Sequence, residues 1–181
     1  MSEIQVFKNV PICSFLIVSM TIVFSLYATT LIKQVPCGKN VMSSFLSNFV
    51  HMDFYHLTSN LIALYSLSRL EREVGPSLFL QLIVFLLVVN TVLEVSFHKI
   101  FPTTKCSIGF SGILFGLITW DLITTKDLDI YLLISIFTMV VIPSLKRSNV
   151  SLSSHCIGAI SGIIGGIITS IVYPDQRSSL L

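Results

Sequence analysis

The chain has 181 residues, of which 53% are hydrophobic and only 11% are charged, and its mean hydropathy is +0.88. Soluble domains carry about 25% charged residues, so the composition excludes an ordinary soluble protein and predicts an integral membrane protein forming one domain over residues 1–181. The net charge is only +2 and the basic residues are scattered, which excludes a nucleic-acid-binding surface.

Six apolar segments predict six helices joined by short polar connections. A helix that spans a bilayer needs about 20 apolar residues, and the first, third and sixth segments are long enough. The others are short or contain polar residues, as do helices that line the interior of a bundle. The predicted helices cover residues 10–32, 55–70, 76–97, 108–124, 128–143 and 153–173.

Polar residues inside these apolar segments are informative, because burying them is costly unless they have a partner or a role. The stretch FVHMDFYHLTSNL, at the start of the second segment, contains His51, His56 and Asn60. The last two are four residues apart, so a helix places them on one face. The fourth segment begins with CSIGFSGILFGL around Ser111, and the sixth begins with SSHCIGAISGIIGG around His155.

Small-residue stripes follow both Ser111 and His155, and such stripes let helix backbones approach closely in lipid. The stripes are Gly112 with Gly116, and Gly158 with Gly162 and Gly166. In a bundle of six alternating spans, the fourth and sixth helices run in the same direction. Packing through the stripes would therefore bring Ser111 and His155 within hydrogen-bond reach, which is the arrangement that activates a serine nucleophile.

Simpler interpretations of each residue stay open. A serine between glycines is most often a packing residue, and a membrane histidine can be a proton relay or can bond a backbone carbonyl. Helix packing accounts for the glycines. It does not account for His155 at the start of one stripe together with His56 and Asn60 on a facing helix.

Taken together and in chain order, these motifs resemble those of the rhomboid intramembrane serine proteases, over nearly the whole chain. The family has H-x-x-x-x-H-x-x-x-N on its second helix, an acidic turn ending in glycine, a G-x-S-G serine on the fourth helix and H-x-x-G-x-x-x-G on the sixth. The matching residues are His51, His56 and Asn60, then EREVG at 71–75, then Ser111, and finally His155, Gly158 and Gly162.

The resemblance implies a six-helix, all-α rhomboid-like bundle and a Ser–His dyad without a catalytic acid, metal or cofactor. Ser111 would attack a peptide bond in or near a transmembrane segment of a substrate protein, and His155 would act as general base and then general acid. The oxyanion would be stabilised by His56, Asn60 and the backbone N–H of Ser111. Supporting positions are His51, Gly109, Gly112, Phe115, Gly158 and Gly162.

The resemblance also implies cytosolic termini, an orientation that the basic residues do not decide, because five would lie on one side and six on the other. The short first loop (33–48) lacks the Trp-Arg pair common in the family and cannot form its usual long hairpin. This trimmed form is similar to the small fungal Golgi rhomboids and predicts a Golgi or other secretory-pathway membrane. A serine, Ser154, precedes the histidine where alanine is common.

Two other functions stay open. One is a catalytically inactive rhomboid relative that binds membrane proteins in quality control. The other is a small proton-coupled transporter that uses His56, His155 and Glu94. Cys13 and Cys156 are predicted to be buried free thiols, and a Cys37–Cys106 disulfide would require both loops to face an oxidising lumen. The oligomeric state does not follow from the sequence.

Overall fold

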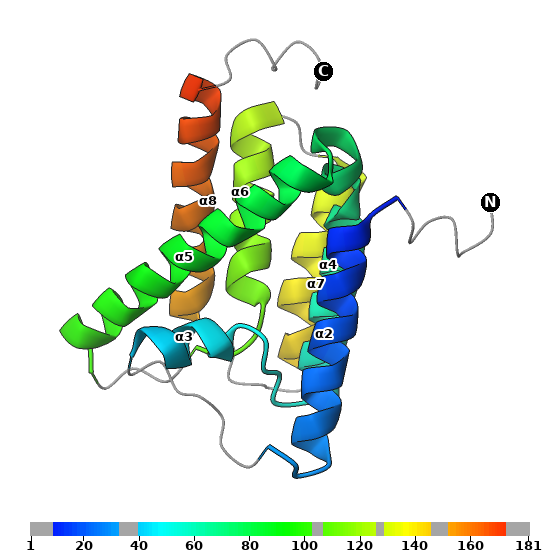
Figure 1. Cartoon of the computed structure of the whole chain (residues 1–181), viewed down its shortest axis with the longest axis vertical. Coiled ribbons are helices and arrows are strands. Elements are labelled where there is room, and N and C mark those ends of the chain that lie inside the picture. Colours follow the sequence, from blue (N-terminus) through cyan, green and yellow to red (C-terminus); the bar gives the residue numbers. More distant parts are fainter. Residues whose placement is uncertain (1–8, 33–39, 103–106, 126–128, 146–151, 173–181) are drawn as a thin grey trace.

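The computed structural model describes residues 9–32, 40–102, 107–125, 129–145 and 152–172, and for residues 140–145 it describes the backbone alone. Within these ranges all regular structure is helical, which confirms the predicted all-α membrane fold (Figure 1). The helices are α2 (Pro11–Ala28), α3 (Val41–Ser47), α4 (Phe54–Val74), α5 (Pro76–Ile100), α6 (Ser111–Thr125), α7 (Ile130–Leu145) and α8 (Leu152–Val172).

Local signals determine where the long helices begin. Pro11 opens α2 and Pro76 opens α5, positions where the missing N–H of proline has no intrahelical partner to lose. Gly75 separates α4 from α5 with a φ of 84°, a conformation that glycine adopts without strain. The Asp53 carboxylate accepts a hydrogen bond from the backbone N–H of His56 at 2.9 Å. This N-cap places His56 in the first turn of α4.

The helix α3 lies in a segment that the sequence analysis left as a loop. Its first turn is closed by two reciprocal hydrogen bonds: Ser43 N donates to Asn40 Oδ1 at 2.8 Å, and Asn40 N donates to Ser43 Oγ at 3.2 Å. This is a capping box in which serine replaces the usual Glu or Gln. A helix of seven residues is too short to show an apolar period, so its sequence carries little signal.

The centre of the bundle is α6, which contacts α4, α5, α7 and α8. At 15 residues it is short for a membrane span, but its neighbours cover it, so its polar groups face protein rather than lipid. Within the described residues, the helices α2, α5 and α8 are long and apolar enough to cross a membrane. Large side chains on their outer faces, among them Phe15, Val88 and Ile171, are exposed, as expected of surfaces that contact lipid.

Ionic contacts gather at the end of α4 that is remote from Ser111. The Arg69 guanidinium pairs with Glu73 at 3.1 Å, with Asp129 at 2.8 Å and with Asp121, and so connects α4 to α6 and to the start of α7. Beside it, the buried Glu71 carboxylate accepts the first backbone N–H groups of α2, from Ile12 and Cys13, both at 2.8 Å. A carboxylate is favourable at this positive end of a helix.

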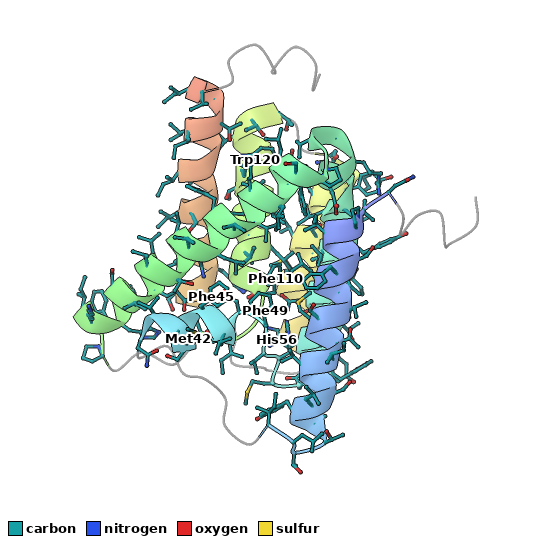
Figure 2. The ribbon with its side chains drawn as sticks, viewed as in Figure 1. Met42, Phe45, Phe49, His56, Phe110 and Trp120 are labelled. Atoms are coloured by element: carbon teal, nitrogen blue, oxygen red, sulfur yellow. The ribbon has the colours of Figure 1, made fainter. Side chains whose placement is uncertain are left out.

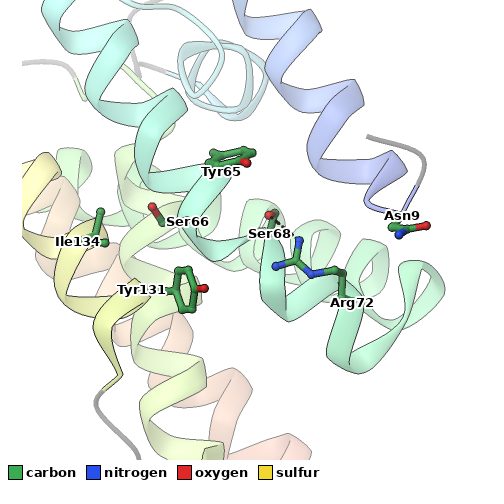
Figure 3. Close-up of a pocket in the computed structure, with 7 residues that line it drawn as sticks. All are labelled: Asn9, Tyr65, Ser66, Ser68, Arg72, Tyr131 and Ile134. Atoms are coloured by element: carbon green, nitrogen blue, oxygen red, sulfur yellow. Dashed lines mark hydrogen bonds between the residues drawn. The ribbon is translucent and has the colours of Figure 1, made fainter. Parts of the chain in front are cut away.

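A cavity of about 470 Å³ lies between the start of α2, the second half of α4 and the start of α7 (Figure 3). Neither Ser111 nor His155 lines it, so it is separate from the predicted site. Its lining residues are Asn9, Tyr65, Ser66, Ser68, Arg72, Tyr131 and Ile134.

The cysteines differ in part from the prediction. Cys13 is a buried free thiol, whereas Cys156 is free but exposed, so its predicted burial was wrong. The reason is its position on α8: Ser154, Ile157 and Gly158 face the bundle and turn Cys156 outward. Cys37 and Cys106 lie outside the described residues.

Candidate active site

A glycine turn places Ser111 at the first position of α6. Gly109 has a φ of 107°, where an L side chain would be strained. A Cβ built on Gly109 would also lie 2.5 Å from Cε1 and 2.6 Å from Nε2 of His56, so the imidazole ring packs directly on the glycine backbone. Both facts require glycine here, and together they bring the His56 ring beside the segment that leads into Ser111.

His155, in the first turn of α8, meets Ser111 across the helix interface. The distance from His155 Nε2 to Ser111 Oγ is 3.0 Å, within hydrogen-bond range. Phe115, one turn after Ser111, packs on the imidazole ring with a centroid distance of 4.4 Å and an interplanar angle of 33°. In the described part of the chain no carboxylate forms an ion pair with His155. The ring is therefore oriented by packing and by Ser111.

The two glycine stripes are in direct contact. A Cβ on Gly158 would lie 2.0 Å from the carbonyl oxygen of Gly112, and a Cβ on Gly162 would lie 2.0 Å from that of Gly116. Only glycine at these positions of α8 allows its backbone to touch that of α6. This close approach of the two helices brings His155 within hydrogen-bond distance of Ser111.

Two side-chain hydrogen bonds also join α6 to α8. Thr119 Oγ1 donates to Ala159 O at 2.9 Å, and Trp120 Nε1 donates to Thr169 Oγ1 at 3.0 Å. Both bonds lie further along the helices than Ser111 and His155. They fix how far α8 is shifted along α6, and in this register the first turns of the two helices lie side by side.

Of the other residues expected on the second helix, His51 lies before the start of α4 and Asn60 lies within α4. His51 is fully buried, its ring meets that of His56 edge-on at 5.1 Å, and its Nε2 accepts a long hydrogen bond of 3.5 Å from the backbone N–H of Phe110. Asn60 Nδ2 donates to the backbone carbonyl of His56 at 2.7 Å, and its Oδ1 has no hydrogen-bond partner among the described atoms. One N–H of the Asn60 amide is therefore used within α4.

The sequence matches the Rhomboid domain over residues 38–172, a range that contains every predicted site residue. The chain belongs to the rhomboid family. A relative named as rhomboid protein L523, of Acanthamoeba polyphaga mimivirus, is 29% identical over 144 residues, which cover 79% of this chain and 81% of the relative. The family assignment made from the ordered motifs is thereby confirmed.

In this rhomboid, α3 supports the turn before Ser111, a contact that the sequence analysis missed. The carbonyl of Ser47 accepts a hydrogen bond from Gly109 N at 2.9 Å. Figure 2 shows Phe45, Phe49 and Phe110 close together, and the ring centroids of Phe49 and Phe110 are 5.8 Å apart. The short first loop therefore contacts the candidate site directly. The available signal was two aromatic residues, Phe45 within α3 and Phe49 just after its end, in a segment too short to show an apolar period.

His51 of this rhomboid lies between α3 and α4, and its burial, with His56 nearby, lowers its pKa to about 3. Below its ordinary pKa of about 6.5, the unfolded chain binds a proton that the folded chain does not. Stability is therefore expected to fall as the pH drops from 6.5 toward 3. We expect His51→Phe to reduce the loss of unfolding free energy between pH 7 and pH 5 by about 1–2 kcal/mol.

The measurement is denaturant unfolding in detergent micelles at pH 7, 6 and 5. His98→Phe, at the end of α5, controls for the loss of one histidine. If the free energy of unfolding changed with pH equally in wild type and in His51→Phe, His51 would not be a buried neutral histidine.

Proposed function

We propose that this rhomboid is an intramembrane serine protease in which Ser111 is the nucleophile and His155 is the general base. The observation that carries the proposal is the 3.0 Å approach of His155 Nε2 to Ser111 Oγ. A serine hydroxyl is a weak nucleophile until an adjacent base takes its proton. In the proposal His155 is that base: its Nδ1 carries the ring proton, and its Nε2 accepts the proton of Ser111.

The reaction follows from these two groups. Ser111 Oγ bonds to the substrate carbonyl carbon as its proton moves to His155 Nε2, and the carbonyl oxygen becomes an oxyanion. When the tetrahedral intermediate collapses, the C–N bond breaks and the imidazolium gives its proton to the leaving amine. Water then attacks the acyl-enzyme, His155 takes the proton of the water, and the ester bond to Ser111 breaks as the hydroxyl regains a proton.

The oxyanion needs donors aimed at the place where charge develops. Ser111 opens α6, so its backbone N–H has no intrahelical partner and belongs to the positive end of the helix. We assign His56 as the side-chain donor, because its ring packs on Gly109 beside the nucleophile. Asn60 is assigned as a second donor. One N–H of its side-chain amide is bonded to the His56 carbonyl, and the other N–H is available for the oxyanion. Loss of one such donor costs about 100–1,000-fold in rate.

Phe115 takes over the orienting role that a carboxylate has in a triad. In a triad the acid fixes the tautomer and the position of the imidazole. Here the phenyl ring, at a centroid distance of 4.4 Å and tilted by 33°, restricts the imidazole plane, which supports a dyad that works without an acid.

For topology and location, the proposal is that the termini are cytosolic and that the protein acts on transmembrane proteins in a Golgi or other secretory-pathway membrane. The start of α2 contacts Glu71 near the end of α4, and α8 ends at the opposite end of the helix from its contact with the start of α6 (Figure 1). With cytosolic termini, the dyad would open toward the lumen. The trimmed first loop supports the Golgi assignment.

The test is cleavage of a single-span model substrate in proteoliposomes, together with labelling by a fluorophosphonate probe. Wild type is expected to cleave the substrate and to react with the probe, and Ser111→Ala is expected to do neither. An unlabelled wild type that captures the substrate without cutting it would favour the inactive binding protein. A proton flux that survives loss of Ser111 would favour the transporter.

A further inference from the structure

Glu94 is the buried carboxylate for which neither the fold nor the proposed mechanism gives a use. Of the other carboxylates in the described residues, Asp53 caps α4, Glu71 caps α2, and Glu73, Asp121 and Asp129 share Arg69. Glu94 lies on α5 and is 3% exposed, and its one described basic partner is His98, one turn further along the same helix. Burying a carboxylate is costly unless polar groups surround it, so its other partners show what it does.

Those partners are two serines, each next to a residue of the dyad. The Ser107 and Ser154 side chains are the polar groups that surround the Glu94 carboxylate. Ser107 lies in the segment that leads into Ser111, and Ser154 directly precedes His155. One rigid group on α5 therefore holds the two chain segments that carry the nucleophile and the base. One carboxylate oxygen, Oε1, has no hydrogen-bond partner among the described atoms.

Independent distances place this cluster directly behind the nucleophile. A Cβ on Gly112 would lie 3.3 Å from Ser154 Oγ and 3.2 Å from Asn90 Oδ1, so both side chains face the residue that follows Ser111. Asn90, one turn before Glu94 on α5, donates from Nδ2 to Asn48 Oδ1 at 3.4 Å. Asn48 is the C-cap of α3. Buried polar side chains thus lie in a row from the end of α3 along α5 to the starts of α6 and α8.

We propose that Glu94 is a positioning residue that keeps Ser111 Oγ and His155 Nε2 at hydrogen-bond distance by holding Ser107 and Ser154 together. The proposal rests on the proposed protease function. It also gives a reason for Ser154, which stands where the family commonly has alanine: its hydroxyl is the link from Glu94 to α8. Because Glu94 contacts neither the dyad nor the substrate position, its removal disturbs the alignment of the catalytic groups and leaves substrate binding intact.

Activity provides the first readout. Misalignment of about 1 Å costs on the order of 100-fold in rate, so Glu94→Leu is expected to lower kcat about 10–100-fold with KM unchanged and to slow fluorophosphonate labelling in proportion. Glu94→Gln is expected to restore most of kcat, because its carboxamide oxygen accepts from both serines. Thr91→Val is the matched control, since Thr91 is equally buried on α5 and its hydroxyl has no hydrogen-bond partner among the described atoms.

Amide hydrogen exchange provides a second readout that does not depend on cleavage. In Glu94→Leu the amides of 107–111 and 153–158 should exchange faster, with those of α2 unchanged, and Thr91→Val should match wild type. If Glu94→Leu fails to fold, Ser107→Ala and Ser154→Ala each cut one link and should each give part of the effect. The proposal would be overturned if folded Glu94→Leu showed unchanged amide exchange or an unchanged kcat. It would also be overturned if Glu94→Gln were as impaired as Glu94→Leu. An inactive wild type whose exchange still responds to Glu94→Leu would overturn the protease function alone.

Discussion

Replacing His155 with alanine is expected to lower kcat by at least about 1,000-fold and to abolish fluorophosphonate labelling, although Ser111 remains in place. The hydroxyl of Ser111 would lose the acceptor that lies 3.0 Å away, and a neutral serine attacks a peptide carbonyl very slowly. The leaving amine would also lose its proton donor. One substitution thus removes both the base and the acid of the cycle, and no described carboxylate or second base takes their place.

Cys156→Ala is the matched control, because this neighbouring residue is an exposed free thiol on the outer side of α8. Single-turnover cleavage in proteoliposomes, with initial rates measured at saturating substrate, separates the loss of chemistry from a loss of binding. A His155→Ala protein that labels and cleaves at the wild-type rate would show that the base is elsewhere. Combining His155→Ala with Ser111→Ala should cause little further loss, because residues that act as one unit are not additive.

The second large effect is expected at the helix contact. Gly158→Ala would place a Cβ 2.0 Å from the carbonyl oxygen and 2.7 Å from the carbonyl carbon of Gly112. Both are backbone atoms that cannot rotate away, so α8 must move off α6. The movement would lengthen the distance from His155 to Ser111, and we expect a loss of about 100-fold in kcat and of about 1–3 kcal/mol in the free energy of unfolding.

Gly165→Ala on the same helix is the comparison that isolates this contact. Its Cβ would meet only side-chain atoms, the nearest at 3.0 Å from Phe85 Cε1, and alanine is the better helix former. We expect wild-type cleavage and stability for this variant. Thermal unfolding and cleavage should be measured on both variants in the same detergent. Equal behaviour of Gly158→Ala and Gly165→Ala would contradict a backbone-to-backbone contact near the dyad.

The candidate site was predictable to the extent that its residues occur in local patterns. The spacing of Gly112 and Gly116 and that of Gly158 and Gly162 match, and parallel helices with matching stripes have few ways to pack. The approach of Ser111 to His155 follows from that packing. Asn60 was less predictable, because a side-chain amide can donate to the preceding turn of its own helix as readily as to a site, and here it donates to the His56 carbonyl at 2.7 Å.

The contacts from α3 and Glu94 could not be predicted because they join segments far apart in the chain. Asn40 and Ser43 form an N-terminal cap that is weak as a sequence signal, and the link from Ser47 O to Gly109 N uses backbone atoms that no side-chain pattern encodes. In the sequence, Glu94 stood out as a charge within an apolar helix, and its only candidate role was in the transporter alternative. That it reaches Ser107 and Ser154 depends on the angle at which α5 crosses α8.

By itself, the sequence determined the membrane class, the all-helical fold and the rhomboid family. Composition, apolar period and the order of motifs can be read directly along the chain, and the bilayer and the geometry of the helix leave few structures that fit them. Only the tertiary structure decided which groups surround Ser111. The 3.0 Å approach of His155, the support from α3 and the bridge by Glu94 each depend on how separate helices cross. The angle and position at which two helices cross are set by close packing over their whole interface, so no single segment of the sequence encodes them.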